Sequence, residues 1–398
     1  MRILIITENF APCWAFGGPP KVLFDAAREL VRRQHSVTVI ATNVLDKSSE
    51  VEKSYDELDG VKVYYLKTYS RWMSWNQKIF LPVGLRTLLN KNVKRFHLII
   101  LTSNRTFSSF FGYYYCRIFN KPYILMPYGS LPGGLGFKRL MKFFLDPIFG
   151  YKIVRDSILV FAQTEHEMEE ARKHGAQPNN VKLMPLNIDF SEFEILPPKG
   201  NFRRKLGINK NERIVLFLGR LHKNKGIDLL LKSFYNLCQK KGDLKLVIVG
   251  RDDGYLSEML TLIKSLKLGE KAIFVGALYG KDRIEAYVDA DVFVLPSSHY
   301  EETSTAALEA CASATPVILT HQASIPGLDS HNAGLTINYD QEELENSLEK
   351  LLDNEEFRIN MSKNARKFIL EQYTTTAWAN RLEEMLNEKA EIFNPEKR

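Results

Sequence analysis

The stretch RIVLFLGRLHKNKGIDLL, residues 213–230, contains the repeating unit from which the fold can be inferred. It begins with an apolar run typical of a buried strand, continues through a loop that carries Arg220 and Lys225, and enters an amphipathic helix after Gly226. A strand followed by a loop and a helix is the building unit of a parallel sheet covered by helices. Similar units lie on both sides of this one in the sequence.

These units form two series, separated by a polar, proline-containing stretch at about residues 190–212. The apolar runs of the first series are residues 2–6, 36–41, 97–101, 121–126 and 157–162, and those of the second are residues 213–218, 244–249, 271–275, 291–295 and 315–319. The alternation predicts an α/β protein with two Rossmann-like, doubly wound domains facing a cleft. We place the first domain at residues 1–195, the second at residues 196–372, and a C-terminal helix that packs back on the first domain at residues 373–398.

Composition narrows the class of protein further. The 398 residues include 54 Lys and Arg against 47 Asp and Glu, and this surplus of +7 attracts phosphate groups in nucleotides or anionic lipids. No apolar run is long enough to cross a bilayer, and the scattered cysteines fit a reducing compartment. We therefore expect a soluble, cytoplasmic protein, peripheral on the inner face of the membrane, with no nucleic-acid partner.

The most informative segment for chemistry is PSSHYEETSTAALEACA, residues 296–312, which follows a buried strand. Its two carboxylates, Glu301 and Glu309, lie on a loop and inside a helix that begins at Ser304 or Thr305. The first amide groups of a helix attract phosphate, and carboxylates accept hydrogen bonds from sugar hydroxyls. The same pattern also fits an ordinary helix whose dipole favours acidic residues near its start.

Two other loops contain residues suited to phosphate binding. Arg220 and Lys225 lie five apart after a core strand, where they can clamp a diphosphate, although a solvated basic turn would look similar. Gly17 and Gly18 follow the first strand and precede a helix, so backbone can approach a ligand there. The spacing differs from G-x-G-x-x-G, which argues against a dehydrogenase-type dinucleotide fold.

Taken together, these motifs resemble those of the family 4 retaining glycosyltransferases, which have the GT-B fold. The shared motifs are the Gly-Gly turn at 17–18, GRL-x-x-x-KG at 219–226, FVGALYG at 274–280, DADVFVLPS at 289–297, the E-x7-E pair at 301 and 309, and TPVI at 315–318. The resemblance implies that Arg220 and Lys225 hold the donor diphosphate, that Glu301 contacts the donor sugar, and that Glu309 binds the ribose hydroxyls.

The resemblance also assigns backbone contacts. It implies that the amides around Ser304 and Thr305 approach the phosphate and that Gly17 and Gly18 close on the same group from the other domain. Two departures from the family pattern are expected to alter the sugar pocket. Glu302, Thr303 and Ser304 replace the usual Gly-Phe-Gly, and Tyr128 stands where a histidine often lies near the donor sugar. Tyr128 can still donate a hydrogen bond and is retained as a catalytic candidate.

The expected function is the transfer of a hexose-type sugar from a nucleoside-diphosphate sugar to a glycan or lipid-linked glycan, with retention, in polysaccharide or glycan biosynthesis. No cofactor or metal is expected, because Arg220, Lys225 and a helix N-terminus can neutralise the leaving diphosphate. Two alternatives remain, a nucleotide-sugar epimerase of the same fold and a catalytically silent sugar-nucleotide binding module.

Two segments of the first domain suggest contact with an anionic membrane surface. Residues 136–152, GFKRLMKFFLDPIFGYK, place Phe137, Leu140 and Phe144 opposite Lys138, Arg139 and Lys142 on a helix. Residues 69–86 add Trp72, Trp75 and Phe80. Ordinary core packing would explain the same apolar residues.

Overall fold

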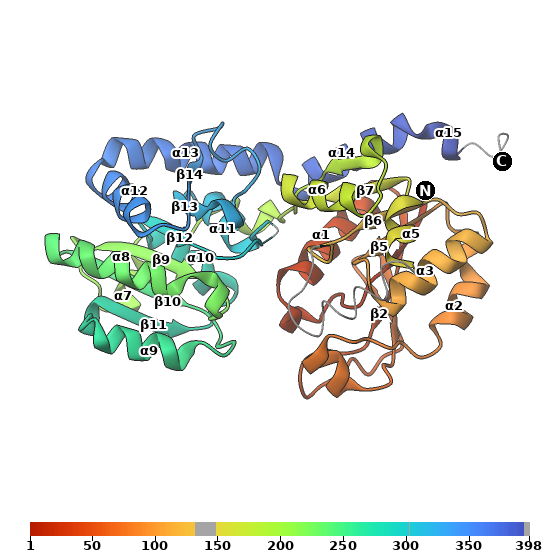
Figure 1. The fold of residues 1–398 in the computed structure, drawn as a ribbon, viewed down its shortest axis with the longest axis horizontal. Helices are drawn as coiled ribbons and strands as arrows, with labels where there is room; N and C mark the ends of the chain where they lie inside the picture. Colours follow the sequence, from red (N-terminus) through yellow and green to blue (C-terminus); the bar gives the residue numbers. More distant parts are fainter. Residues whose placement is uncertain (132–148, 302, 394–398) are drawn as a thin grey trace. The chain divides into compact units, whose positions relative to one another are not determined.

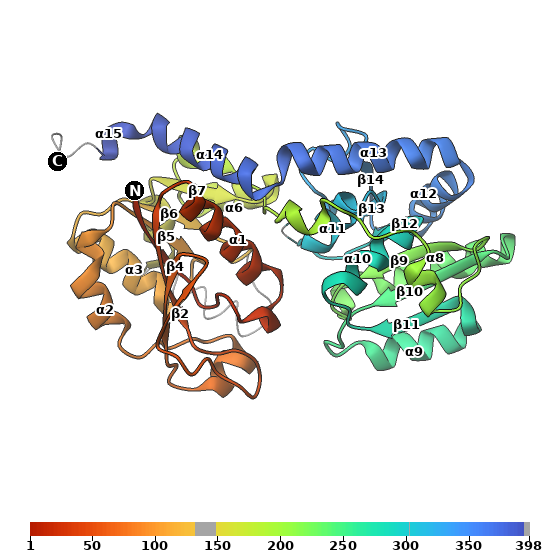
Figure 2. The ribbon, with the colours of Figure 1, turned by 180° about the vertical axis from the view of Figure 1, so that it is seen from behind.

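The computed structural model describes residues 1–131, 149–301 and 303–393. The chain divides into two compact units, of which unit 1 comprises Met1–Asn187 with Thr375–Arg398 and unit 2 comprises Ile188–Thr374 (Figures 1 and 2). The chain thus leaves unit 1 after Asn187 rather than after residue 195. The reason is local, because the amide of Ile188 donates to Tyr373 (2.8 Å) and Arg366 donates to the carbonyl of Phe193 (2.7 Å), both inside unit 2.

Unit 1 is built on an eight-stranded sheet with the order β3-β4-β2-β1-β5-β6-β7-β8. Its strands are β1 (Arg2–Ile6), β2 (Ser36–Thr42), β3 (Tyr55–Leu58), β4 (Val61–Leu66), β5 (Leu98–Thr102), β6 (Tyr123–Met126), β7 (Leu159–Ala162) and β8 (Val181–Leu183). All pairings are parallel except that of β3 with β4. The predicted doubly wound sheet is therefore confirmed, with three strands that the apolar runs did not indicate.

Helices cover both faces of this sheet because successive residues of its strands point to opposite sides. Ile3 and Ile5 of β1 join the core beneath α1 (Gly18–Arg32) and α14 (Thr375–Glu388). Leu4 and Ile6 join the core beneath α2 (Leu85–Asn92), α3 (Phe107–Ile118), α5 (Tyr151–Arg155) and α6 (Glu165–Lys173). Helix α14 buries Trp378, Ala379 and Leu382 against α1, and Arg33 pairs with Glu383 at 2.7 Å.

Unit 2 is built on a six-stranded, fully parallel sheet with the order β11-β10-β9-β12-β13-β14. The strands are β9 (Arg213–Leu218), β10 (Leu244–Val249), β11 (Ala272–Gly276), β12 (Val292–Leu295), β13 (Val317–Thr320) and β14 (Gly334–Ile337). The helices that precede or follow them include α7 (Asn201–Lys205), α8 (Ile227–Lys240), α9 (Leu256–Ser265), α10 (Gly280–Asp289), α11 (Thr305–Ala312), α12 (Gln341–Asp353) and α13 (Glu355–Gln372). The second predicted doubly wound sheet is likewise confirmed.

Candidate functional site

The order of strands in unit 2 marks where a ligand can enter. The chain runs from β9 through β10 to β11 on one side of the sheet, and then returns to place β12 on the other side of β9. The loops after β9 and β12 therefore leave in opposite directions, which opens a crevice at the carboxyl ends of the strands. The predicted residues Arg220 and Lys225 lie in the first loop, and Glu301 lies in the second.

These two loops are in direct backbone contact. Gly226 has a φ of +67°, and a Cβ atom on it would lie 1.8 Å from the carbonyl oxygen of Pro296. The amide of Ser298 donates to the carbonyl of Asn224 at 2.9 Å. Only glycine fits at position 226, because both its backbone conformation and the approach of Pro296 exclude a side chain. This contact brings the end of the first loop against the start of the second.

Lys225 and Glu301 form an ion pair across this contact. The hydroxyl of Ser297 donates to the other oxygen of the Glu301 carboxylate, and the Glu301 amide donates to the carbonyl of Gln322 at 2.8 Å. The side chains of Lys225 and Glu301 are 15% and 19% exposed, so the pair can still meet a ligand. Lys225, which was assigned to the donor diphosphate, and Glu301, which was assigned to the donor sugar, are thus held together.

Arg220 pairs with Asp253 on the loop after β10, and its side chain is 51% exposed. The neighbouring Asp252 fixes that loop by accepting hydrogen bonds from the amides of Gly254 (2.9 Å), Tyr255 (3.0 Å) and Leu256 (3.0 Å). These bonds, that from Leu256 foremost, hold the pKa of Asp252 below its usual range. Asp253 therefore keeps the guanidinium of Arg220 near the carboxyl ends of β9 and β10.

Helix α11 begins as the sequence predicted. Ser304 is its N-cap, with its hydroxyl accepting from the amide of Ala307 at 3.5 Å, and Thr305 is the first helical residue. The first amides of a helix have no partner within the helix, so they can donate to an anion. Thr303 is buried, whereas Glu302 lies outside the described residues.

Glu309, one turn into α11, is held by two residues of α10. The hydroxyl of Tyr287 donates to it at 3.2 Å, and Arg283 lies 3.3 Å away while also pairing with Glu192 at 2.8 Å. Burial, and after it the Glu309 carboxylate, raises the pKa of Tyr287 well above its usual value. Arg283 and Tyr287 were not predicted from the sequence; they lie four residues apart on α10, which places them on one face of that helix.

The other predicted residues, Gly17, Gly18 and Tyr128, belong to unit 1. Gly17 has a φ of +98° and connects a short 3-10 helix (Trp14–Phe16) to α1, whose first residue is Gly18. Tyr128 follows β6 with a φ of +49°, and its hydroxyl donates to the sulfur of Met126 at 3.9 Å. Burial raises the pKa of Tyr128. The Tyr128 hydroxyl therefore contacts another residue of unit 1, Met126.

The predicted aromatic surface of residues 69–86 is smaller than expected. Trp72 is 63% exposed, but Phe80 is only 6% exposed, and the ring of Trp75 packs edge-on against Phe16 at 5.1 Å. The prediction was wrong for Phe80 because the Trp14–Phe16 turn, distant in sequence, covers it. Phe137, Leu140 and Phe144, with Lys138, Arg139 and Lys142, lie outside the described residues.

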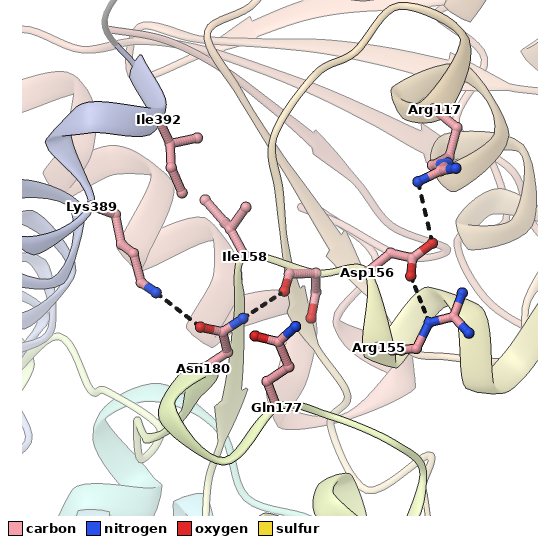
Figure 3. A pocket seen from close by; sticks show the side chains of 9 residues that line it. Arg117, Arg155, Asp156, Ile158, Gln177, Asn180, Lys389 and Ile392 are labelled. Carbon is pink, nitrogen blue, oxygen red and sulfur yellow. Dashed lines mark hydrogen bonds and ion pairs between the residues drawn. The ribbon is translucent and has the colours of Figure 1, made fainter. Parts of the chain in front are cut away.

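A cavity of about 480 Å³ lies at the edge of the unit 1 sheet where strands β7 and β8 begin (Figure 3). Ser157 and Ile158 line it just before β7, and Gln177 and Asn180 line it just before β8. Three cations, Arg117, Arg155 and Lys389, line the cavity together with a single carboxylate, Asp156. Arg155 lies 2.9 Å from the Asp156 carboxylate, and Arg117 lies 3.6 Å from it. Because one carboxylate faces three cations, the cavity carries a surplus of positive charge.

Two further findings concern the described residues as a whole. No three of their His, Cys, Asp or Glu side chains come together as a metal site would require. None of their helices has the length and apolar character that crossing a membrane demands.

Two family models match successive parts of the chain. Residues 17–187 match the glycosyl transferase 4-like domain, and residues 198–368 match the glycosyl transferases group 1. An uncharacterized glycosyltransferase of Methanocaldococcus jannaschii is 27% identical over 97% of both chains. Mannosylfructose-phosphate synthase of Agrobacterium fabrum is 31% identical, over 42% of this chain and 38% of its own length. A D-inositol 3-phosphate glycosyltransferase of Corynebacterium aurimucosum is 27% identical over 62% and 60%.

Solved structures share the fold over nearly the whole chain. Sucrose-phosphate synthase from Thermosynechococcus elongatus superposes with a TM-score of 0.75 and 18% identity, covering 98% of each chain. The Anabaena protein HepE in complex with UDP also gives a TM-score of 0.75, with 16% identity, covering 98% of this chain and 100% of its own. These likenesses confirm the GT-B fold class.

Proposed function

We propose that this chain, which belongs to the group 1 glycosyltransferases of the family 4 type, transfers a hexose-type sugar from a nucleoside-diphosphate sugar to an acceptor glycan with retention. The observation that carries the proposal is the pairing of Lys225 with Glu301 at the carboxyl ends of β9 and β12. A cation suited to a diphosphate and a carboxylate suited to sugar hydroxyls are placed side by side there. A nucleotide sugar contains both groups in one molecule.

Breaking the bond between sugar and diphosphate leaves negative charge on the diphosphate. Lys225, Arg220 and the first amides of α11 can stabilise this charge, because groups that already face the bound diphosphate need no further reorganisation when the bond breaks. On this proposal the diphosphate shares Lys225 with Glu301, and Arg220 turns from Asp253 toward the phosphates. The enzyme then needs no metal to neutralise the leaving group, and we expect activity to persist after treatment with EDTA.

Retention follows if the acceptor attacks the same face of the sugar that the diphosphate leaves. Glu301 lies beside Lys225, and its two oxygens are engaged by Lys225 and Ser297. We assign it to orienting the sugar hydroxyls rather than to forming a covalent intermediate. Glu309, held by Tyr287 and Arg283, is assigned to the ribose.

We take UDP-sugars as the first donors to test, because HepE was solved in complex with UDP and with UDP-glucose. Isothermal calorimetry with UDP and UDP-glucose should show binding to the wild-type chain. Lys225→Ala and Arg220→Ala should each weaken binding at least about tenfold, since a charge-assisted contact to phosphate is lost. Lys223→Ala is the matched control, because it removes an exposed lysine from the same loop. Equal effects of Lys225→Ala and Lys223→Ala would contradict the assignment.

Analysis of the reaction products, with and without an acceptor, distinguishes the two alternative functions from transfer. A transferase releases nucleoside diphosphate in the presence of an acceptor, whereas an epimerase yields a second sugar nucleotide without one. A silent binding module does neither while still binding the donor.

We also propose that the acceptor is lipid-linked and that unit 1 contacts an anionic membrane. The support is the outer face of α3, where Phe107, Tyr114 and Ile118 are 48%, 46% and 52% exposed. Arg117 on the same helix and Arg155 on α5 line the basic cavity beside it (Figure 3). Exposed apolar side chains beside cations are typical of interfacial helices.

Sedimentation with vesicles tests the membrane proposal. The chain should sediment with phosphatidylglycerol-containing vesicles at low salt and should not sediment with phosphatidylcholine alone. Arg117→Ala with Arg155→Ala should reduce sedimentation, whereas Lys210→Ala with Lys264→Ala, which removes two exposed cations from unit 2, should not. Equal sedimentation of both double variants would favour a water-soluble acceptor.

A further inference from the structure

The cavity in Figure 3 is built from parts of unit 1 that are distant in sequence. Arg117 comes from the last turn of α3, and Arg155 is the last residue of α5. Asn180 directly precedes β8, and Lys389 lies between α14 and α15 (Ala390–Phe393). The volume of about 480 Å³ is sufficient for a small-molecule ligand. No residue assigned to the donor lines this cavity, so its ligand is a separate question.

Asp156 fixes two of the three cations of the cavity. Its carboxylate lies 2.9 Å from Nε of Arg155 and 3.6 Å from Nη1 of Arg117, and it accepts a hydrogen bond from the Tyr113 hydroxyl at 2.8 Å. Burial alone would raise the pKa of Asp156, but the hydrogen bonds from Arg155 and Tyr113 outweigh burial and hold the pKa below its usual range. The carboxylate is therefore ionised and already engaged, whereas each guanidinium keeps further N–H groups for a ligand.

The third cation, Lys389, is held by one amide side chain. Oδ1 of Asn180 accepts a hydrogen bond from Nζ of Lys389 at 2.9 Å, and Nδ2 of Asn180 donates to the carbonyl of Ser157 at 3.3 Å. The ammonium has three N–H groups, and this bond uses one of them. Figure 3 shows Lys389 on one side of the cavity, with Arg117 and Arg155 on the other. A ligand between them would meet cations from two sides.

Positive charge continues along the same edge of the sheet. Arg2 is the first residue of β1, His97 directly precedes β5, and Lys121 lies just before β6. Burial lowers the pKa of His97, and the charges of Arg2 and Lys121 lower it further. The strands β1, β5, β6 and β7 are neighbours in that order, so these cations and the cavity share one edge. Charge of one sign along an edge attracts anions towards it.

The charge of the cavity indicates which anion fits. Among the described residues that line it, three cations and the carboxylate of Asp156 leave a surplus of two positive charges. A phosphate monoester carries nearly two negative charges at neutral pH, whereas a carboxylate or a phosphodiester carries one. Guanidinium groups also match pairs of phosphate oxygens. The amide of Gln177 can bind a hydroxyl group on the rest of the ester.

We propose that this cavity binds a small phosphate monoester, with Arg117 and Arg155 on one side of the phosphate and Lys389 on the other. Two sources share this chemistry, a free polyol or sugar phosphate and the headgroup of phosphatidic acid. The proposal goes beyond the proposed function, because the site requires neither the donor nor transfer. The bound phosphate connects the end of α14 with the starts of β7 and β8, so binding should also stabilise unit 1.

Calorimetric titration of the full chain with glycerol 3-phosphate, in the presence of excess UDP, tests the site. Glycerol 3-phosphate should bind the wild-type chain with the same affinity with and without UDP. Glycerophosphoglycerol, a diester with a single charge, should bind at least about tenfold more weakly. Arg155→Ala and Lys389→Ala should each weaken the binding of glycerol 3-phosphate at least about tenfold, because each removes a charge-assisted contact. Lys389→Arg, which keeps the charge, should retain most of the affinity.

Lys152→Ala is the matched control. Lys152 is an exposed cation on the same helix as Arg155, but it does not line the cavity, so this variant should keep binding. The Arg155 side chain is 58% exposed, so its removal should leave folding intact, and urea unfolding without ligand checks this. The proposal is overturned if glycerol 3-phosphate does not bind the wild-type chain, if UDP displaces it, if the diester binds as tightly, or if Arg155→Ala binds as well as Lys152→Ala.

Vesicles of phosphatidylcholine that contain phosphatidic acid distinguish the two sources. If the headgroup is the ligand, these vesicles should displace glycerol 3-phosphate and should sediment the wild-type chain but not Lys389→Ala. If a free ester is the ligand, the vesicles should leave the binding of glycerol 3-phosphate unchanged. Either result supports a site for a phosphate monoester and identifies where the ester comes from.

Discussion

Replacing Glu8 by glutamine should stabilise unit 1 at pH 8 relative to the wild-type chain, and should do so much less at pH 5. Burial raises the pKa of the Glu8 carboxyl from 4.5 to about 7 in the folded chain. Between these values the folded state holds a proton that the unfolded state has released. The free energy of unfolding of the wild type therefore falls as the pH rises through this window, and it levels off above about pH 7.

The size of the effect follows from the same shift. Each pH unit between the two pKa values corresponds to about 1.4 kcal/mol, so the full loss amounts to roughly 3 kcal/mol. Glutamine does not titrate, and its oxygen can still accept hydrogen bonds from Thr106 and Ser108. The difference in unfolding free energy between variant and wild type should thus grow by roughly 3 kcal/mol from the acid to the alkaline side of the window.

Urea unfolding followed by tryptophan fluorescence measures this difference in the unfolding free energy of unit 1. The four tryptophans, Trp14, Trp72, Trp75 and Trp378, all belong to unit 1. Glu52→Gln, at an exposed carboxyl of the same unit, serves as the control and should show no such trend. If the difference for Glu8→Gln were the same at pH 5 and pH 8, the carboxyl would be ionised throughout and the argument from burial would fail.

Three further outcomes are expected. Asn104→Leu should leave the unfolding free energy of unit 1 unchanged or raise it by about 1–3 kcal/mol, because it removes buried atoms that have no hydrogen-bond partner. A loss of similar size in urea unfolding would show that the Asn104 side chain is hydrogen-bonded in the free protein. Gly226→Ala should lower the calorimetric unfolding temperature and abolish UDP binding, because a Cβ would lie 1.8 Å from the Pro296 oxygen; a thermally normal variant that binds UDP would exclude this loop contact. Glu309→Gln should raise the KM for the donor and spare kcat, as expected for uniform binding of ribose, whereas a loss in kcat alone would assign Glu309 to the reaction itself.

The sequence predicted the central strands because buried parallel strands are continuous apolar runs. It missed β4, which alternates buried and exposed residues, and β8, which has three residues. It predicted Arg220, Lys225 and Glu301 from their place after core strands. It could not predict that Lys225 pairs with Glu301, because that contact depends on the order in which β9 and β12 lie in the sheet.

Other features of the site depend on contacts that no local pattern records. Arg283 and Tyr287 hold Glu309 only because α10 packs beside α11. The unpaired atoms of Glu8 and Asn104 are recognisable only once burial and hydrogen bonds are known for both. Phe80 looked like a surface aromatic because its partner, Phe16, lies far away in the sequence.

The division of unit 1 between the two ends of the chain affects its synthesis. Helix α1 emerges from the ribosome before unit 2, but Trp378, Ala379 and Leu382 of α14, which complete the core beneath it, emerge only after the whole of unit 2. Unit 2 is continuous in sequence, so all of its residues are available before unit 1 can close. We therefore expect the nascent chain to present the uncovered side of α1 to chaperones throughout most of translation, and a premature stop after Thr374 to leave it exposed permanently.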